Sequence, residues 1–256
     1  MPLTYGQYLK IPELLELQAG LSDPEHHDEP LFIIIHQVYE LWFKLILHEL
    51  DSAHRHLEED RPIEATRLLR RVVEVQRLLV QQVRILETMR PQDFLGFRYH
   101  LNPASGFQSV QFRELEFVLG LKDPAILQRL DCLPEERARL LERLEKPSLL
   151  DAVDGLLRRR GLGGPGEDWR LKALVRVYEE AEAHADLNAL AETLIEIDEC
   201  LALWRAHHIQ MVERMIGAKR GTGGSAGVGY LATTLAKRAF PDLWTARTHI
   251  GEEPGA

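Results

Sequence analysis

Apolar residues recur at alternating steps of three and four between residues 187 and 215, which places them on one face of an α-helix. The residues of this face are Leu187, Leu190, Leu194, Ile197, Leu201, Trp204, His208, Met211 and Met215. His208 therefore lies on the predicted buried face, whereas His207 lies about 100° away in a more polar position. A single histidine in such a place is either a core residue bonded to a carbonyl group or an axial metal ligand.

A second apolar segment, residues 31–47, is also predicted to be a helix. Apolar side chains cover nearly its whole circumference, so we expect this helix to run through the protein interior. Phe32, His36, Tyr39 and Phe43 share one face of it. Burial of an ionisable ring costs free energy, so two buried histidines on two helices favour a functional site over a structural one.

The rest of the pattern predicts further helices and an all-α fold. A helix is expected to begin at Pro62, with an apolar face formed by Leu68, Val72, Val75, Leu79, Val83 and Leu86. Residues 121–180 contain shorter helical pieces, separated by prolines and a glycine-rich stretch, and are predicted to be a peripheral helical region. No linker divides residues 1–256 convincingly, so we expect one domain, a bundle of long helices around a pocket.

Two loop segments carry candidate binding residues. Arg98 follows Pro91, which is expected to stop the preceding helix, and stands among Phe94, Leu95 and Phe97. A guanidinium in such surroundings needs a partner, either a bound carboxylate or a structural ion pair. The second segment is the glycine-rich loop 219–230. Its lysine precedes the glycines and it follows a helix, unlike a phosphate-binding Walker loop, so we expect its backbone N–H groups and the Thr222 hydroxyl to meet another ligand.

Composition narrows the function classes further. The formal net charge of −9 argues against a nucleic-acid surface, and no apolar stretch has the length and composition expected of a membrane span. The two cysteines lie far apart in sequence, and we expect a cytoplasmic protein with reduced thiols. The run from His26 to Glu29 reads as a helix start with acidic first-turn residues, not as a metal site.

Six segments of the chain, in the same order, resemble the bacterial tryptophan 2,3-dioxygenase family. They are residues 3–9, the residues around His36, Gly96-Phe97-Arg98, residues 105–109, residues 204–208 and the loop 219–230. The resemblance spans nearly the whole chain. It implies a heme enzyme that inserts both atoms of O₂ into the indole C2–C3 bond of L-tryptophan and so forms N-formyl-L-kynurenine, the first step of tryptophan degradation by the kynurenine pathway.

The resemblance also implies roles for individual residues. His208 matches the axial ligand of heme b, whose iron is ferrous for activity, and His36 matches the catalytic distal histidine that bonds the indole N–H. Arg98 matches the partner of the substrate carboxylate, and Thr222 the loop residue that contacts the substrate ammonium and carboxylate. Ser105 and Gly106 match positions at the cofactor.

Other matched positions concern the pocket wall and the assembly. Phe32 and Leu101 match apolar pocket residues, and Phe94 stands where several relatives have tyrosine, which removes a hydroxyl from the carboxylate end. In the family, residues matching Tyr5, Tyr8 and Leu9 reach into the pocket of a neighbouring subunit. The N-terminal segment 1–20 is therefore expected to be exchanged between subunits of a homotetramer.

Two alternative functions remain at this point. One is a related heme-dependent oxygenase that acts on a modified indole or on tyrosine, which Phe94 leaves open. The other is a non-enzymatic heme-binding or sensor protein, which the joint retention of His36, Arg98 and Thr222 disfavours.

Overall fold

The structure is a computed structural model that describes residues 2–219, 221 and 228–252. Within these residues all regular secondary structure is helical, with no strand, and the predicted all-α fold is confirmed. The α-helices are α1 Tyr5–Leu9, α2 Ile11–Leu15, α3 Glu29–Glu58, α4 Pro62–Leu86, α5 Pro91–Phe97, α6 Val110–Leu119, α7 Ile126–Arg129, α8 Pro134–Glu145, α9 Leu149–Arg159, α10 Trp169–Glu179, α11 Ala185–Ile216, α12 Val228–Ala232 and α13 Pro241–His249. Two 3₁₀ helices, η1 Arg98–Leu101 and η2 Gly106–Gln108, lie between α5 and α6.

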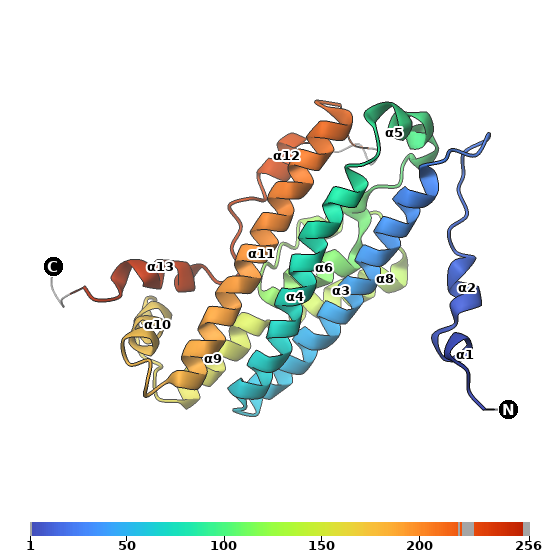
Figure 1. The fold of residues 1–256 in the computed structure, drawn as a ribbon. Helices are drawn as coiled ribbons and strands as arrows, with labels where there is room; N and C mark the ends of the chain where they lie inside the picture. The colour runs from blue at the N-terminus through green and yellow to red at the C-terminus, as the bar shows by residue number, and fades with distance from the viewer. Residues whose placement is uncertain (1, 220, 222–227, 253–256) are drawn as a thin grey trace.

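Three long helices, α3, α4 and α11, lie side by side and give the molecule its long axis, with α4 between the other two (Figure 1). α5 lies at one end of this layer, and α6 and α9 pack against it. Local signals begin and end these elements. Pro62 and Pro91 occupy the first turns of α4 and α5, where no backbone N–H is needed, and α6 starts at a Ser109 cap and ends at Gly120 in a left-handed conformation.

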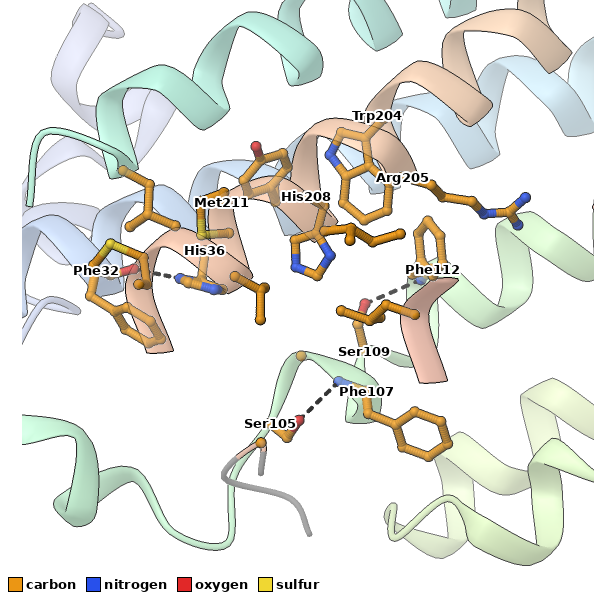
Figure 2. Close-up of a pocket in the computed structure, with 18 of the residues that line it drawn as sticks. Phe32, His36, Ser105, Phe107, Ser109, Phe112, Trp204, Arg205, His208 and Met211 are labelled. Atoms are coloured by element: carbon orange, nitrogen blue, oxygen red, sulfur yellow. Dashed lines mark hydrogen bonds between the residues drawn. The ribbon is translucent and has the colours of Figure 1, made fainter. Parts of the chain in front are cut away.

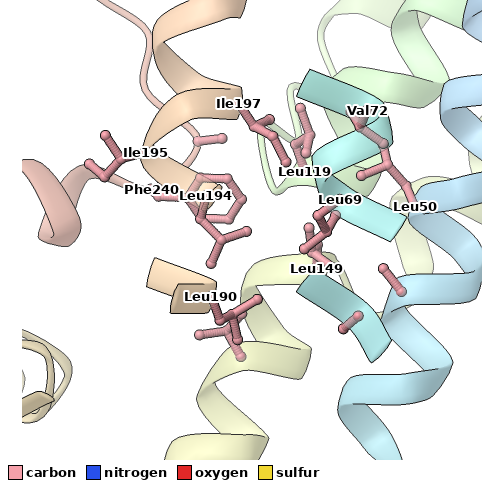
Figure 3. Packing of buried hydrophobic residues seen from close by; sticks show 14 of the residues in the cluster. Leu50, Leu69, Val72, Leu119, Leu149, Leu190, Leu194, Ile195, Ile197 and Phe240 are labelled. Carbon is pink, nitrogen blue, oxygen red and sulfur yellow. The ribbon is translucent and has the colours of Figure 1, made fainter. Parts of the chain in front are cut away.

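The main core lies where α4, α9 and α11 meet (Figure 3). α11 contributes Leu190, Leu194 and Ile197, and these side chains approach those of α4 and the neighbouring helices. Burying each such side chain stabilises the fold by roughly 1.5–3 kcal/mol. The predicted apolar face of α4 is buried at all its positions, and that of α11 is buried everywhere except at Trp204 and His208. Both side chains line a cavity, and Trp204 also packs against the main core.

The expectation that the helix at residues 31–47 is interior is wrong for the isolated chain. α3 packs against α4, α6 and α9, but its outer side is open, and Ile34 and Leu41 are 45% and 53% exposed. Part of the apolar surface of this helix is therefore not covered by its own chain. Among the described helices, α3 alone has the length and apolar composition of a membrane span, so the expectation that no stretch of the chain has them is corrected. Core helices of soluble proteins share this property.

The prolines at positions 91 and 134 begin helices and do not end the helices before them. α4 ends at Leu86, well before Pro91, and Pro91 begins α5, so the expectation that Pro91 stops the preceding helix is corrected. Within the region predicted as peripheral, Pro134 begins α8. The same region contains α9, whose Leu149 and Leu156 are fully buried in the main core.

A buried carboxylate helps to fasten the C-terminal part of the chain to α11. Asp198, which is 1% exposed, accepts hydrogen bonds from the backbone N–H of Ala239 at 2.8 Å and of Phe240 at 3.2 Å. It also accepts one from the Trp244 indole N–H at 3.0 Å. The chain that returns from the glycine-rich loop is thus held against the helix that carries His208.

The N-terminal segment stands apart from the bundle (Figure 1). Tyr5 and Tyr8 are 77% and 72% exposed, and Leu9 is also exposed. α1 is held locally by a capping box in which Thr4 and Gln7 bond each other's backbone N–H groups. The link to the bundle comes later in the chain, where Gln37 of α3 donates to the Leu17 carbonyl at 2.8 Å.

Candidate functional site

A cavity of about 270 Å³ lies among α3, α5, α6 and α11. His36 projects into it from α3 and His208 from α11, and the segment 105–109 faces them across the open space (Figure 2). The wall is mainly apolar and aromatic, with a few polar side chains, as is usual for a small-molecule or cofactor site. The two histidines that the helix patterns singled out are therefore brought together.

His36 is fixed by a bond within its own helix. Its Nδ1 lies 2.7 Å from the Phe32 carbonyl oxygen, which can only accept, so Nδ1 carries the proton and donates. Burial lowers the pKa of His36 below its usual value, although this bond and the charge of Glu40 oppose the shift. The ring is thus neutral near pH 7, and Nε2 is left as a hydrogen-bond acceptor.

His208 has an aromatic support one turn earlier on α11. The Trp204 ring stacks on the imidazole with centroids 5.3 Å apart and an angle of 9° between the planes. Burial, assisted by nearby His36, lowers the pKa of His208 to about 4. No described residue forms a hydrogen bond with the ring, which is neutral near pH 7 with a free nitrogen lone pair. His207 does not contribute to the cavity wall, as its predicted position on α11 implies.

Aromatic rings form the wall beside His36. The Phe32 ring lies 4.1 Å from the His36 ring and stacks on Phe94 with centroids 5.6 Å apart. Phe97 is fully buried and packs edge-on against both Phe32 and Phe94. This cluster joins α3 to α5 and gives the His36 side of the cavity an apolar surface.

The other residues expected at the site divide into four groups. Arg98, which begins η1 directly after α5, lines the cavity, as do Ser105 and Gly106. Leu101 packs against the apolar cluster beside the cavity but does not line it, so its expected place in the pocket wall is corrected. Tyr5, Tyr8 and Leu9 are on the exposed N-terminal segment, outside the cavity of their own chain. Thr222 lies outside the described residues.

A buried ion network that the sequence patterns did not indicate lies at the far side of the cavity. Glu116 of α6 pairs with Arg113 at 2.6 Å and with Arg205 of α11 at 2.8 Å, and all three side chains are nearly inaccessible and line the cavity. Arg205 also donates to the carbonyl groups of Thr234 and Lys237. Arg113 in turn lies over the rings of Phe107 and Phe112.

Comparisons with known proteins agree with this geometry. The family model for tryptophan 2,3-dioxygenase matches residues 1–173 and 169–250. The chain belongs to the tryptophan 2,3-dioxygenase family. It is 50% identical to a tryptophan 2,3-dioxygenase of a Nocardioides species, over 97% of this chain and 95% of the relative. It is 44% identical to a tryptophan 2,3-dioxygenase of Xanthomonas oryzae, and 43% identical to one of Xanthomonas campestris, in both cases over 97% of this chain and 88% of the relative.

Membership of the tryptophan 2,3-dioxygenase family confirms the resemblance over nearly the full chain. The matched residues include α3, α5, α6 and α11, the elements that enclose the cavity. The exposed N-terminal segment is matched as well, which makes it part of the family pattern.

The buried network predicts a large stability difference between two glutamates. Glu116→Gln leaves Arg113 and Arg205 without their carboxylate, so we expect a loss of about 3–5 kcal/mol in the free energy of unfolding. Glu74→Gln removes an exposed ion pair with Arg77 and should cost less than about 1 kcal/mol. Urea unfolding of both variants measures the difference. Similar losses would show that the network is not a structural element.

Proposed function

We propose that this protein is a heme-dependent dioxygenase that inserts both atoms of O₂ across the indole C2–C3 bond of L-tryptophan and releases N-formyl-L-kynurenine. Family membership over nearly the whole chain supports the reaction. The observation that carries the assignment to this site is the joint presence of His36, His208 and Arg98 in one mainly apolar cavity. Its substrates are L-tryptophan and O₂.

The residues of the cavity fit a heme group. His208 offers a neutral imidazole with no partner among the described residues, which is the form in which histidine binds iron. Arg113 lines the cavity, and its Nε has no hydrogen-bond partner among the described residues. His208 would hold the iron of heme b, and Arg113 would pair with a propionate carboxylate. When bound, the ferrous heme supplies the binding and activation of O₂.

His36 is suited to orient the substrate indole. Because its Nδ1–H is used by the Phe32 carbonyl, Nε2 can accept a hydrogen bond but cannot donate one. The indole N–H of tryptophan is a donor only, so the two groups are complementary. His36 therefore holds the indole ring in a fixed orientation, and the low pKa of the imidazole keeps the acceptor available near neutral pH.

Arg98 and the apolar wall would bind the remaining parts of tryptophan. Arg98 lines the cavity, and its guanidinium would pair with the carboxylate, while Thr222 of the glycine-rich loop would meet the ammonium and carboxylate groups. Phe32 and Phe94 supply a stacked aromatic surface for the indole ring. Analogues without the carboxylate would lose the charge-assisted pair with Arg98, which gives selectivity for the amino acid.

We infer that the protein acts as a homotetramer in the cytoplasm, with N-terminal segments exchanged between subunits. Two features support assembly. Tyr5, Tyr8 and Leu9 are exposed on a segment that stands apart from its own bundle, and α3 has apolar side chains on an uncovered side. In an exchanged assembly Tyr5, Tyr8 and Leu9 would contact the pocket of a neighbour, and the apolar side of α3 would be covered.

The heme assignment predicts different effects of two adjacent histidines. His208→Ala removes the iron ligand and should weaken heme binding on the order of tenfold or more, whereas His207→Ala should retain heme, because His207 is not in the cavity wall. The heme-to-protein absorbance ratio after purification measures this difference. Equal heme contents would exclude His208 as the ligand.

The role of His36 is tested by the reaction itself. Heme-loaded, reduced protein should form N-formyl-L-kynurenine from tryptophan, followed by its absorbance and its mass. His36→Ala should lower kcat/KM roughly ten- to a thousandfold while retaining measurable product, since one orienting hydrogen bond is lost and the iron is kept. The loss should be smaller for 1-methyltryptophan, which lacks the N–H. Equal losses for both substrates would assign His36 a different role.

If the N-terminal segment is exchanged between subunits, its deletion should affect turnover but not heme content. Deletion of residues 1–9 should reduce tryptophan turnover without emptying the heme site, because Tyr5, Tyr8 and Leu9 lie outside the cavity of their own chain. Steady-state assays, heme content and light scattering measure turnover, cofactor and assembly in turn. Full activity of the truncated protein, or of a monomer, contradicts the exchanged arrangement.

A further inference from the structure

The loop between α2 and α3 is fastened to the start of α3 by one carboxylate. Glu29, which is 1% exposed, accepts hydrogen bonds from the backbone N–H of Leu21 at 2.7 Å and of Ser22 at 3.0 Å, and from the Ser22 hydroxyl. A Cβ atom at Gly20 would lie 2.6 Å from the Glu29 carboxylate, so the chain passes this group closely. The loop 20–28 is therefore fixed against the start of α3, the helix that carries His36.

The same loop fixes the ring of His26. Its backbone N–H donates to the Ser22 hydroxyl at 2.9 Å, which joins His26 to the Glu29 carboxylate through one side chain. The ring Nδ1 accepts the backbone N–H of Asp28 at 3.3 Å. An imidazole that is held at the backbone and at one ring nitrogen has little rotational freedom, so the remaining edge of the ring points in a defined direction.

That edge lies against α5 just before Arg98. A Cβ atom at Gly96 would lie 2.7 Å from the His26 Nε2 and 2.9 Å from its Cδ2, so the ring occupies the space that a side chain would take there. The His26 and Phe97 rings are 5.3 Å apart, and Phe97 is fully buried. Arg98 follows immediately and begins η1 at the cavity.

We propose that His26 is a positioning residue for Arg98. The imidazole, held by the loop 20–28, fits against Gly96 and Phe97 and fixes the junction between α5 and η1, so that the Arg98 guanidinium faces the cavity. This inference rests on the proposed pairing of Arg98 with the substrate carboxylate. It gives a reason for glycine at position 96 other than helix formation, for which alanine is the better residue.

A double-mutant cycle tests the contact. On heme-loaded protein, the change in heme absorption reports binding of L-tryptophan and of tryptamine, which lacks the carboxylate. Gly96→Ala should raise the Kd for tryptophan about tenfold and His26→Ala about fivefold, because each disturbs the same junction. The double variant should bind as His26→Ala does, since removal of the ring also removes the clash. The Kd for tryptamine should change less than about twofold throughout.

Matched variants separate positioning from loss of structure. His27→Ala alters a fully exposed neighbour and should leave both Kd values unchanged, and heme content and Tm show whether each variant is folded. Effects of Gly96→Ala and His26→Ala that multiply in the double variant, or that fall equally on tryptophan and tryptamine, overturn the proposal.

Arg98→Ala distinguishes failure of this inference from failure of the proposed substrate contact. It should weaken tryptophan binding on the order of a hundredfold and leave tryptamine nearly unchanged. If Arg98→Ala discriminates between the two ligands and the His26 variants do not, the positioning role alone is wrong. If Arg98→Ala weakens both ligands equally, the carboxylate contact is wrong and the role of His26 is wrong with it.

Discussion

The carboxylate of Glu116 is the interaction on which the cavity depends. It holds α6 to α11 through Arg205, and Arg205 reaches on to the carbonyl groups of Thr234 and Lys237. One buried anion thereby fixes two helices and the chain that returns from the glycine-rich loop. Burying the charges of Glu116, Arg113 and Arg205 costs desolvation free energy, which is offset only when each charge keeps its partner. Few other conformations of these side chains are therefore stable. That restriction gives the cavity a defined wall on the side away from His36.

The opposite side of the cavity is defined by neutral groups. Phe32, Phe94 and Phe97 form an apolar cluster, and burial keeps His36 and His208 uncharged near pH 7. The neutral His36 imidazole already uses Nδ1–H in a hydrogen bond, so its Nε2 can only accept one. His208 has no such bond to a described residue and is supported instead by a ring stacked on its face. Two residues of the same type thus acquire different capabilities from their local contacts.

The sequence predicted what local periodicity can encode. The apolar faces of α4 and α11 and the shared face of Phe32, His36, Tyr39 and Phe43 follow from residue spacing, and the structure has them. The place of Arg98 at a pocket is implied by the family resemblance and not by spacing. The network of Glu116 and Arg205 joins residues far apart in the chain, and no pattern along α6 distinguishes its partners. The interior position expected for α3 failed for a related reason. Periodicity shows how much of a helix is apolar, but not whether its own chain or another covers it.

The N-terminal segment shows how a short exposed element can still be suited to binding. A five-residue helix is too short to be stable through propensity alone, yet α1 has a complete capping box between Thr4 and Gln7. Its bonds are local and need no contact with the bundle, so the placement of Tyr5 and Tyr8 on one short helix is encoded before any partner is met. A preformed helix has fewer torsion angles left to order on contact with another surface than an unstructured tail has, so less conformational entropy would be lost in such a contact. At its other end, the N-terminal segment joins the bundle beside Gly96 through the loop 20–28, which Glu29 holds in place. This end of the segment therefore also has few torsion angles left to order.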